Sequence, residues 1–176
     1  DVYRMSLAGD TSALSTPGQF INIRLSGFYL RRPISVCDYD SDGMVIIYKV
    51  VGGGTKAMSE LLPGAQLDTL SGLGNGFDSS KSGDKPLLVG GGVGVPPMYG
   101  LCRRLAAEGK KPTVVLGFNS YGDVFYEQEF KELGADVRVA TADGSCGAKG
   151  FVTDVIGGLD YSFFYACGPE PMFRAM

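Results

Sequence analysis

Hydrophobic and polar residues alternate with period two in the first half of the chain. Residues 19–25 read Gln-Phe-Ile-Asn-Ile-Arg-Leu, which is the alternation of a strand with one buried face. Residues 44–51 form a second apolar run, and residues 65–70 form a third after a Pro-Gly turn. Between these runs, only residues 55–62 have helical spacing. Short strands with turns and little helix predict a small antiparallel β-barrel.

The pattern changes after residues 79–85, a polar stretch of small residues that we interpret as a linker. From there on, strand-like and helix-like segments alternate, which is typical of a parallel sheet with crossover helices. The chain therefore predicts a β-barrel domain over residues 1–82 and a doubly wound α/β domain over residues 83–176. The expected strands of the second domain are 86–89, 113–118, 137–140 and 162–166, and the expected helices are 98–107, 126–133 and 152–156.

Composition narrows the classes of function. The chain of 176 residues is 44% apolar and 20% charged, which allows a packed core, and its net charge of -3 comes without the basic stripe of a nucleic-acid-binding protein. It contains no histidine, so the usual general base is missing and a bound cofactor is expected to carry any chemistry. The four cysteines are too far apart for a metal motif, so we predict no metal site.

Targeting signals are also missing. The start is polar and lacks a basic region, so it does not resemble a signal peptide. The longest uncharged run, residues 86–102, is too short and too rich in Gly and Pro to span a bilayer. We expect a cytoplasmic protein without a membrane partner, with its cysteines reduced.

One stretch carries the strongest chemical signal. Residues 87–98 read Leu-Leu-Val-Gly-Gly-Gly-Val-Gly-Val-Pro-Pro-Met, which indicates a strand, a tight turn and the start of a helix. Glycine lets a ligand approach closely, and a helix start offers N–H groups to a phosphate. The third glycine of Gly-x-Gly-x-x-Gly would fall on Val95, so the ordinary dinucleotide fingerprint is not met. Nucleotide binding and a merely tight turn both remain open from these residues alone.

Three further stretches have the residues of a cofactor site. Residues 31–35 read Arg-Arg-Pro-Ile-Ser, in which Arg32 has the planar donors that suit a pyrophosphate, although adjacent arginines are also common on surfaces. Residues 52–55, Gly-Gly-Gly-Thr, form either a second phosphate-binding helix start or a flexible turn. Residues 165–169, Tyr-Ala-Cys-Gly-Pro, end the last strand, where open α/β sheets bind ligands, although a structural cysteine is the alternative.

Taken in order, these stretches resemble the ferredoxin–NADP reductase superfamily, in which an FAD-binding barrel precedes a pyridine-nucleotide domain. Together with Gly-Asn-Gly-Phe at residues 74–77 and the double proline Pro96-Pro97, they resemble more specifically the electron-transfer subunits of NAD-dependent dihydroorotate dehydrogenase. The resemblance covers nearly the whole chain.

The resemblance implies a set of site residues. Ser35 would lie near the flavin N5 and Cys167 beside the nicotinamide, as the two catalytic residues, and Arg32 would bind the FAD pyrophosphate. The residues implied for FAD are Arg32, Pro33, Ile34, Ser35, Ile47, Tyr48, Lys49, Gly54 and Thr55, and those implied for NAD(H) are Gly92, Gly94, Val95 and Gly168.

The resemblance also implies a function: hydride transfer between nicotinamide and flavin. The partner would be an FMN-containing catalytic subunit that oxidises dihydroorotate to orotate in pyrimidine biosynthesis, in a heterotetramer. The family carries a C-terminal cysteine-rich segment with a [2Fe–2S] cluster, and we expect that segment outside residues 1–176, since both ends of the sequence look cut. Residues 119–123 contain no Lys or Arg that could bind the 2′-phosphate of NADPH, which favours NADH as the nucleotide.

Two alternatives remain open at this point. One is another reductase of the superfamily, such as a free flavin reductase or a hydrogenase-associated subunit. The other is a cofactor-free module that retains the fold.

Overall fold

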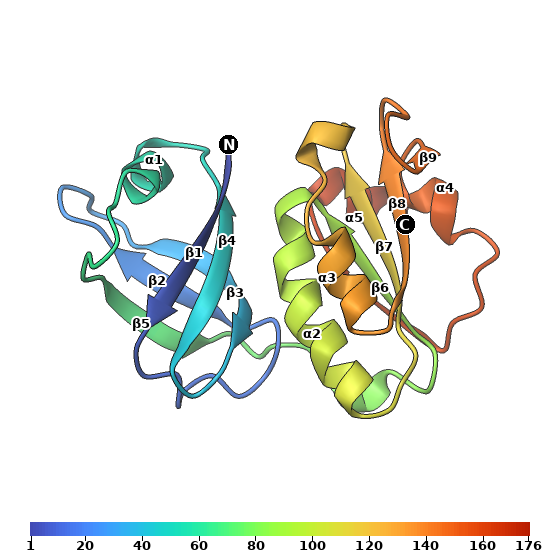
Figure 1. Ribbon diagram of the computed structural model, residues 1–176, viewed down its shortest axis with the longest axis horizontal. Helices are drawn as coiled ribbons and strands as arrows, with labels where there is room; N and C mark the ends of the chain where they lie inside the picture. Colours follow the sequence, from blue (N-terminus) through green and yellow to red (C-terminus); the bar gives the residue numbers. More distant parts are fainter. The chain divides into compact units, whose positions relative to one another are not determined.

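The computed structural model describes residues 1–176 and divides into two compact units, Asp1–Gly76 and Phe77–Met176 (Figure 1). The first contains one five-stranded sheet and the second contains another. The change from antiparallel strands to strand–helix alternation, predicted from the sequence, is confirmed. The division lies before the polar stretch that the sequence indicated as a linker.

The first unit is an antiparallel sheet with the strand order β1-β4-β3-β2-β5. Alternation places Ile21, Ile23 and Ile46 in its core, where all three are fully buried together with Met58 of the helix. The elements of this unit are β1 (Val2–Ala8), β2 (Phe20–Arg24), β3 (Arg32–Tyr39), β4 (Gly43–Lys49), α1 (Gly53–Ser59) and β5 (Asp68–Leu73).

In the first unit, the hydrophobic pattern did not predict strand β3. Pro33 near its start lacks the N–H that a ladder uses, and the register shifts between Val36 and Asp38. That irregularity leaves Val36 and Cys37, two successive residues, both buried. A bulged strand does not show clean period-two alternation, which explains why the pattern overlooked it.

The second unit is a parallel sheet with the strand order β10-β6-β7-β8-β9. Its chain runs from β6 through β7 and β8 to β9, and then returns to place β10 on the other side of β6. The elements are η1 (Ser79–Lys81), β6 (Pro86–Gly91), η2 (Gly92–Gly94), α2 (Val95–Ala107), β7 (Thr113–Phe118), η3 (Tyr121–Asp123), α3 (Glu127–Glu132), β8 (Asp136–Thr141), β9 (Ala148–Lys149), α4 (Val152–Ile156), β10 (Phe163–Cys167) and α5 (Glu170–Ala175).

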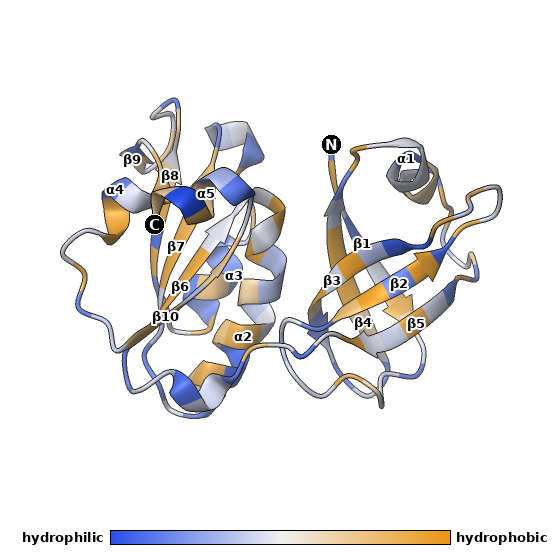
Figure 2. Cartoon of the chain, turned by 180° about the vertical axis from the view of Figure 1, so that it is seen from behind, coloured by the Kyte–Doolittle hydropathy of each residue, from blue (hydrophilic) through white to orange (hydrophobic).

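Both faces of this sheet are covered, as a doubly wound fold requires. Leu88 and Leu116 pack on one face with residues of α2 and α3. Their neighbours Leu87 and Val115 pack on the other face with Val152 of α4. The middle of each strand is therefore apolar on both sides, and Figure 2 shows orange segments along β6 and β7.

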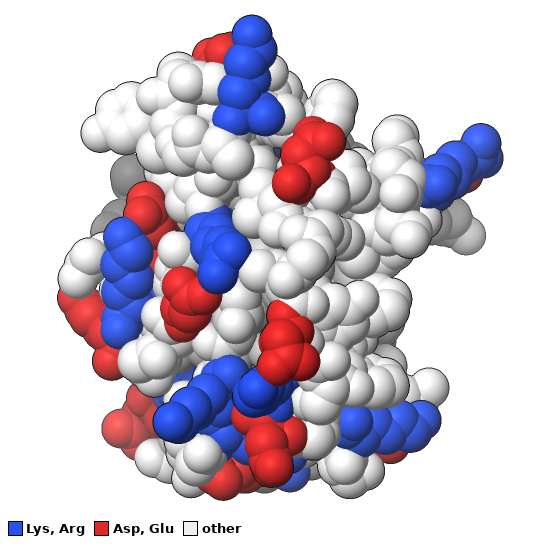
Figure 3. Space-filling model, turned by 90° about the vertical axis from the view of Figure 1, so that its right-hand side faces the viewer, with Lys and Arg blue, Asp and Glu red and all other residues white.

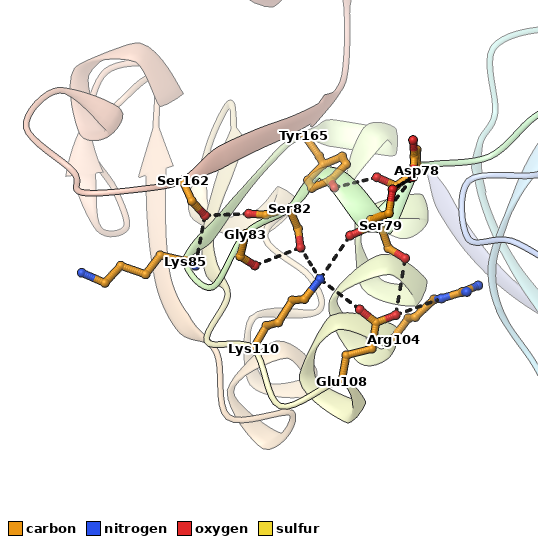
Figure 4. A network of polar contacts seen from close by, with 11 residues as sticks. Asp78, Ser79, Ser82, Gly83, Lys85, Arg104, Glu108, Lys110, Ser162 and Tyr165 are labelled. Atoms are coloured by element: carbon orange, nitrogen blue, oxygen red, sulfur yellow. Dashed lines mark hydrogen bonds and ion pairs between the residues drawn. The ribbon is translucent and has the colours of Figure 1, made fainter.

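The stretch that follows the first unit is bonded to the second one. The Lys110 ammonium donates to the Ser82 hydroxyl at 2.5 Å and to the Ser79 carbonyl at 3.1 Å, and it lies 3.1 Å from a Glu108 carboxylate oxygen (Figure 4). The Ser162 hydroxyl, just before β10, donates to the Ser82 carbonyl at 2.6 Å.

An aromatic side chain completes this attachment. The Tyr165 hydroxyl donates to the Asp78 carbonyl at 2.8 Å, and its ring meets Phe77 edge-on at 5.9 Å. Burial, and then the nearby Asp78 carboxylate, raise the pKa of Tyr165, so its hydroxyl keeps the proton that it donates. Residues 77–85 therefore belong structurally to the second unit, and the change of unit falls six residues before the predicted domain boundary at 82/83.

The surface mixes both signs of charge. Figure 3 shows Lys and Arg side chains interspersed with Asp and Glu over one face. Surface residues of opposite charge form ion pairs such as Arg138–Asp136, at 3.2 Å. None of the four cysteines is joined in a disulfide. No helix combines the length and the apolar character that crossing a membrane requires.

Candidate functional site

The glycine-rich turn lies at the topological switch point of the parallel sheet. β6 ends at Gly91, and β10, its parallel neighbour, ends with Cys167 opposite Gly90. On the far side of β6 the chain continues to β7, so the direction of winding reverses between β6 and β10. Open α/β sheets bind ligands at such a point, outside the carboxyl ends of the strands. The fold thus brings together the two glycine-containing turns that the sequence singled out separately.

The two turns touch, and only glycine fits between them. A Cβ on Gly94 would overlap the Cys167 carbonyl and come within 2.6 Å of the Gly168 nitrogen, both of which are backbone atoms. Cβ atoms on Gly91 and Gly168 would both collide with the Met172 sulfur, at 2.9 and 2.8 Å. Gly92 has a φ of +52° and open space beyond it, so the turn presents bare backbone to whatever binds there.

The helix after the turn offers fewer N–H groups than the sequence argument expected. α2 begins at Val95, three residues before the predicted start, so Pro96 and Pro97 lie inside its first turn. Neither proline has an N–H, and the Val95 N–H is bonded to the Gly92 carbonyl. Any phosphate here would be held by the amides of the η2 turn and by the helix dipole, rather than by α2's own first amides.

Cys167 and Ser35, the two predicted catalytic residues, lie in different units. Burial raises the pKa of the Cys167 thiol, so it is neutral at physiological pH. A neutral, partly buried thiol provides polarizable contact surface without charge. Ser35 is half-buried on β3, directly opposite Phe20 of β2.

The adjacent arginines separate into two roles. The Arg31 guanidinium bonds both carboxylate oxygens of Asp68 on β5 at 3.0 Å, and it also donates to the Asn22 carbonyl. That fork–fork pair ties the loop before β3 to the β2–β5 edge. The Arg32 guanidinium lies instead over the Phe28 ring, 4.9 Å from its centroid, and donates to the Leu30 carbonyl. Arg32 therefore bonds no carboxylate, and its cation can receive an anion.

Gly54 lies directly beneath that guanidinium. A Cβ at this position would overlap the Arg32 Nε and come within 2.6 Å of its Cζ, and Gly54 is buried. The fold thus joins Arg32 with the start of α1, where amides in the first turn of a helix lack partners within it. A guanidinium beside such amides is suited to a phosphate group, and the cradle fits the pyrophosphate of FAD.

The Thr55 hydroxyl is bonded within the loop that precedes α1. That hydroxyl accepts from the Val51 and Gly52 N–H groups at 2.9 and 3.2 Å, and donates to the Gly52 carbonyl at 3.1 Å. It is 7% exposed. Thr55 fixes the shape of the loop that presents Gly54, while its backbone amide remains part of the cradle.

The remaining predicted FAD residues alternate between the two faces of the sheet. Ile34 packs against the first-unit core and Tyr48 is part of it, with the Tyr48 ring stacked on Tyr3 at 5.9 Å. Burial raises the pKa of Tyr48, which is therefore neutral. The side chains one position away, Pro33, Ser35, Ile47 and Lys49, occupy the opposite face by alternation.

Sequence reasoning missed two neighbours of these residues. Phe28 lies in a loop without periodicity, and only the fold shows that its ring supports Arg32. Asn22 stands between the buried Ile21 and Ile23, where the alternation of a strand places an outward-facing polar residue. Its position therefore gave no indication of a functional role. Its Oδ1 is nevertheless buried and accepts no hydrogen bond.

The loops after β7 and β8 complete the carboxyl edge of the second sheet. Asp123 accepts from the Ser120 N–H and hydroxyl, and Asp143 accepts from Ser145, whose hydroxyl also receives the Tyr121 N–H at 2.7 Å. The bonds from Ser145 lower the pKa of Asp143. Both carboxylates add negative charge to this edge of the sheet.

Comparison with known proteins agrees with this geometry. Residues 88–176 match the model of the oxidoreductase NAD-binding domain family. Among solved structures, that of an NADH-dependent reduced ferredoxin-NADP oxidoreductase is 32% identical, with a TM-score of 0.86 over 99% of this chain and 65% of that one. A ferredoxin reductase in carbazole 1,9a-dioxygenase is 25% identical, with a TM-score of 0.85 over 99% of this chain and 59% of that one.

Curated relatives match the chain along its full length. A protein of Shouchella clausii is 48% identical and one of Fusobacterium nucleatum is 44% identical, each over 100% of this chain and over 71% and 73% of their own lengths. Both carry the name dihydroorotate dehydrogenase B (NAD(+)), electron transfer subunit. The resemblance inferred from the short motifs is therefore confirmed, and the chain belongs to the family of electron transfer subunits of NAD-dependent dihydroorotate dehydrogenase.

Proposed function

We propose that the chain is a flavoprotein that holds FAD on its first unit, takes up NAD(H) on its second, and passes hydride between them. The observation that carries the proposal is the meeting of the Gly94 turn with Cys167 and Gly168 at the switch point, because it makes a bare-backbone site where this type of sheet binds nucleotides. When bound, FAD accepts hydride from NADH at its N5, or returns it to NAD.

The chain's own residues position the cofactors. Arg32 and the start of α1 hold the FAD pyrophosphate, and Pro33 and Ser35 lie on the face available to the ring. Gly92, Gly94 and Val95 admit the nucleotide, and Gly168 and the neutral Cys167 lie beside the nicotinamide. Hydride transfer needs orientation and electrostatics rather than a protein base, which agrees with a chain that contains no histidine.

We further propose that the catalytic partner is an FMN-containing dihydroorotate dehydrogenase subunit, in a cytoplasmic heterotetramer. The names of the relatives support a partner, because an electron transfer subunit implies a second subunit. The relatives are longer than this chain, and we place the [2Fe–2S] cluster outside residues 1–176. No group of three or more Cys, Asp or Glu side chains is positioned here to hold a metal.

Titration of FAD into the flavin-free protein, followed by flavin fluorescence, tests the proposal. We expect one FAD per chain, weaker binding in Arg32→Ala, and near-normal binding in Arg31→Ala, because Arg31 is bonded to Asp68. Protein that takes up no FAD would overturn the proposal, as would Arg32→Ala with normal affinity.

Reduction of the bound flavin by each nucleotide then identifies the donor. We expect faster reduction by NADH than by NADPH, because Asp123 and Asp143 oppose a 2′-phosphate. The positively charged Lys149 lies beside Gly144 in the same region. Comparing the two reduction rates therefore tests whether the two carboxylates or this lysine decides the preference. Faster reduction by NADPH would refute the proposed preference for NADH.

A further inference from the structure

The Asn22 side chain has a polar atom that the fold leaves without a partner. Its Oδ1 is buried and accepts no hydrogen bond, the one such side-chain atom that the structure contains. A buried acceptor without a donor destabilises a fold, because it has lost its hydrogen bonds to water and gained none in return. An orphan of this kind in a well-packed sheet indicates a partner that is not part of the chain.

The neighbours of Asn22 explain why no donor within the protein reaches it. In the register of the sheet it faces Pro33 on β3 and Leu70 on β5, and neither side chain has an N–H or O–H. The nearby cation, Arg31, bonds the backbone carbonyl of Asn22 and the Asp68 carboxylate. The two side chains directly opposite Asn22 therefore offer no donor, and the nearby guanidinium is bonded to other groups.

The side chain lies on the same face as the proposed flavin residues. Ile21 and Ile23 are fully buried in the core, so Phe20 and Asn22 project from the opposite face. Across the strand pair, Phe20 is opposite Ser35 and Asn22 is opposite Pro33. Directly opposite side chains begin about 4.5–5.5 Å apart. Asn22 therefore lies beside Pro33 and Ser35, the two residues that we propose face the flavin ring.

We propose that Asn22 is a flavin-positioning residue whose Oδ1 accepts a hydrogen bond from N3–H of the isoalloxazine ring. The inference rests on the proposed function, since it requires FAD on this unit. The orphaned atom is an acceptor, and the oxidised ring has a single N–H, at N3. Rotation about the broad χ2 torsion of Asn turns the oxygen towards the ring.

The test compares two ligands and two variants. FAD and N3-methyl-FAD, which lacks the donor, are titrated into flavin-free wild type, Asn22→Leu and a control, Gln128→Ala, whose carboxamide lies on α3. We expect wild type and the control to prefer FAD about five- to tenfold, as one hydrogen bond warrants. Asn22→Leu, of similar shape but without an acceptor, should bind both ligands equally.

Two further readouts separate this role from a structural one. Removing an unsatisfied acceptor should leave the melting temperature of flavin-free Asn22→Leu equal to or above that of wild type, while the stabilisation produced by FAD decreases. Asn22→Asp keeps an acceptor and adds a charge, so the midpoint potential of the bound flavin should become more negative, because reduction adds negative charge to the ring.

The outcomes are distinct. Wild type that binds neither ligand would refute the proposed function itself. Wild type that binds FAD, with Asn22→Leu still preferring FAD over its N3-methyl analogue, would refute only the role of Asn22. A flavin-free Asn22→Leu that melts well below wild type would show that the carboxamide acts within the fold.

Discussion

Substituting Gly94 with alanine should separate the two turns at the switch point. The new Cβ would lie 2.6 Å from the Gly168 nitrogen and overlap the Cys167 carbonyl. These are backbone atoms, so relief requires the Cys167–Gly168 turn to move by about 1 Å, and overpacking of this kind costs about 1–3 kcal/mol. A shift of that size at a reacting centre can lower the rate about 100-fold.

The matched control is Gly109→Ala, just beyond the other end of the same helix. Gly109 has a φ of +78° and open space around it, so alanine there is strained by about 1–2 kcal/mol without any collision. Both variants should melt at lower temperature, by about 4–8 °C for each kcal/mol in a unit of this size. Only Gly94→Ala should also slow flavin reduction.

The assay is anaerobic rapid mixing of the FAD-loaded protein with NADH, together with thermal unfolding of each variant. Gly94→Ala with a normal reduction rate would refute the assignment of this turn to the nicotinamide. An equal loss of rate in Gly109→Ala would show that the effect is one of stability alone.

Four other variants or measurements test separate parts of the structure. Gly54→Ala should weaken FAD binding by displacing the Arg32 guanidinium, as titration would show; unchanged affinity would contradict the cradle. The hydrogen bonds from Arg31 lower the pKa of Asp68, so this pair stabilises the folded state fully above the ordinary carboxyl pKa and loses that effect as the pH falls through the lowered pKa. Arg31→Ala should therefore reduce the free energy of unfolding at neutral pH and reduce it less in acid, where an equal loss at both pH values would contradict the pairing. Cys167 should react with iodoacetamide more slowly than free cysteine at pH 7.5 and faster as pH rises, with rapid labelling at neutral pH as the contrary result. Lys110→Met should lower the stability of the second unit by about 1–3 kcal/mol in denaturant unfolding, since Ser82 loses a charged partner.

The sequence predicted those elements whose periodicity is clean. Residues 19–25 alternate because one face of β2 is the core, and residues 113–118 and 152–156 match β7 and α4 residue for residue. β3 was missed because Pro33 and a bulge interrupt its alternation. The start of α2 was placed too late because prolines at its first positions look like a turn, although both are compatible with a first helical turn.

The candidate site was predictable as residue types but not as partners. The resemblance implied a role for Arg32 alone, and only the fold shows that Arg31 binds Asp68 while Gly54 lies beneath Arg32. Likewise, nothing local indicates that Gly94 must be small because Cys167 approaches it. Asn22 could not be found at all, since an orphaned acceptor is defined by neighbours from three strands.

Direct hydride transfer is the central claim, and an isotope effect tests it most directly. The FAD-loaded protein is mixed anaerobically with NADH that carries deuterium on one face or the other of nicotinamide C4, and bleaching of the flavin is followed in a single turnover. We predict that deuterium on one face slows bleaching and appears on the flavin before exchange, while deuterium on the other face has little effect. No bleaching by NADH, or the same rate with either label and with none, would contradict the account.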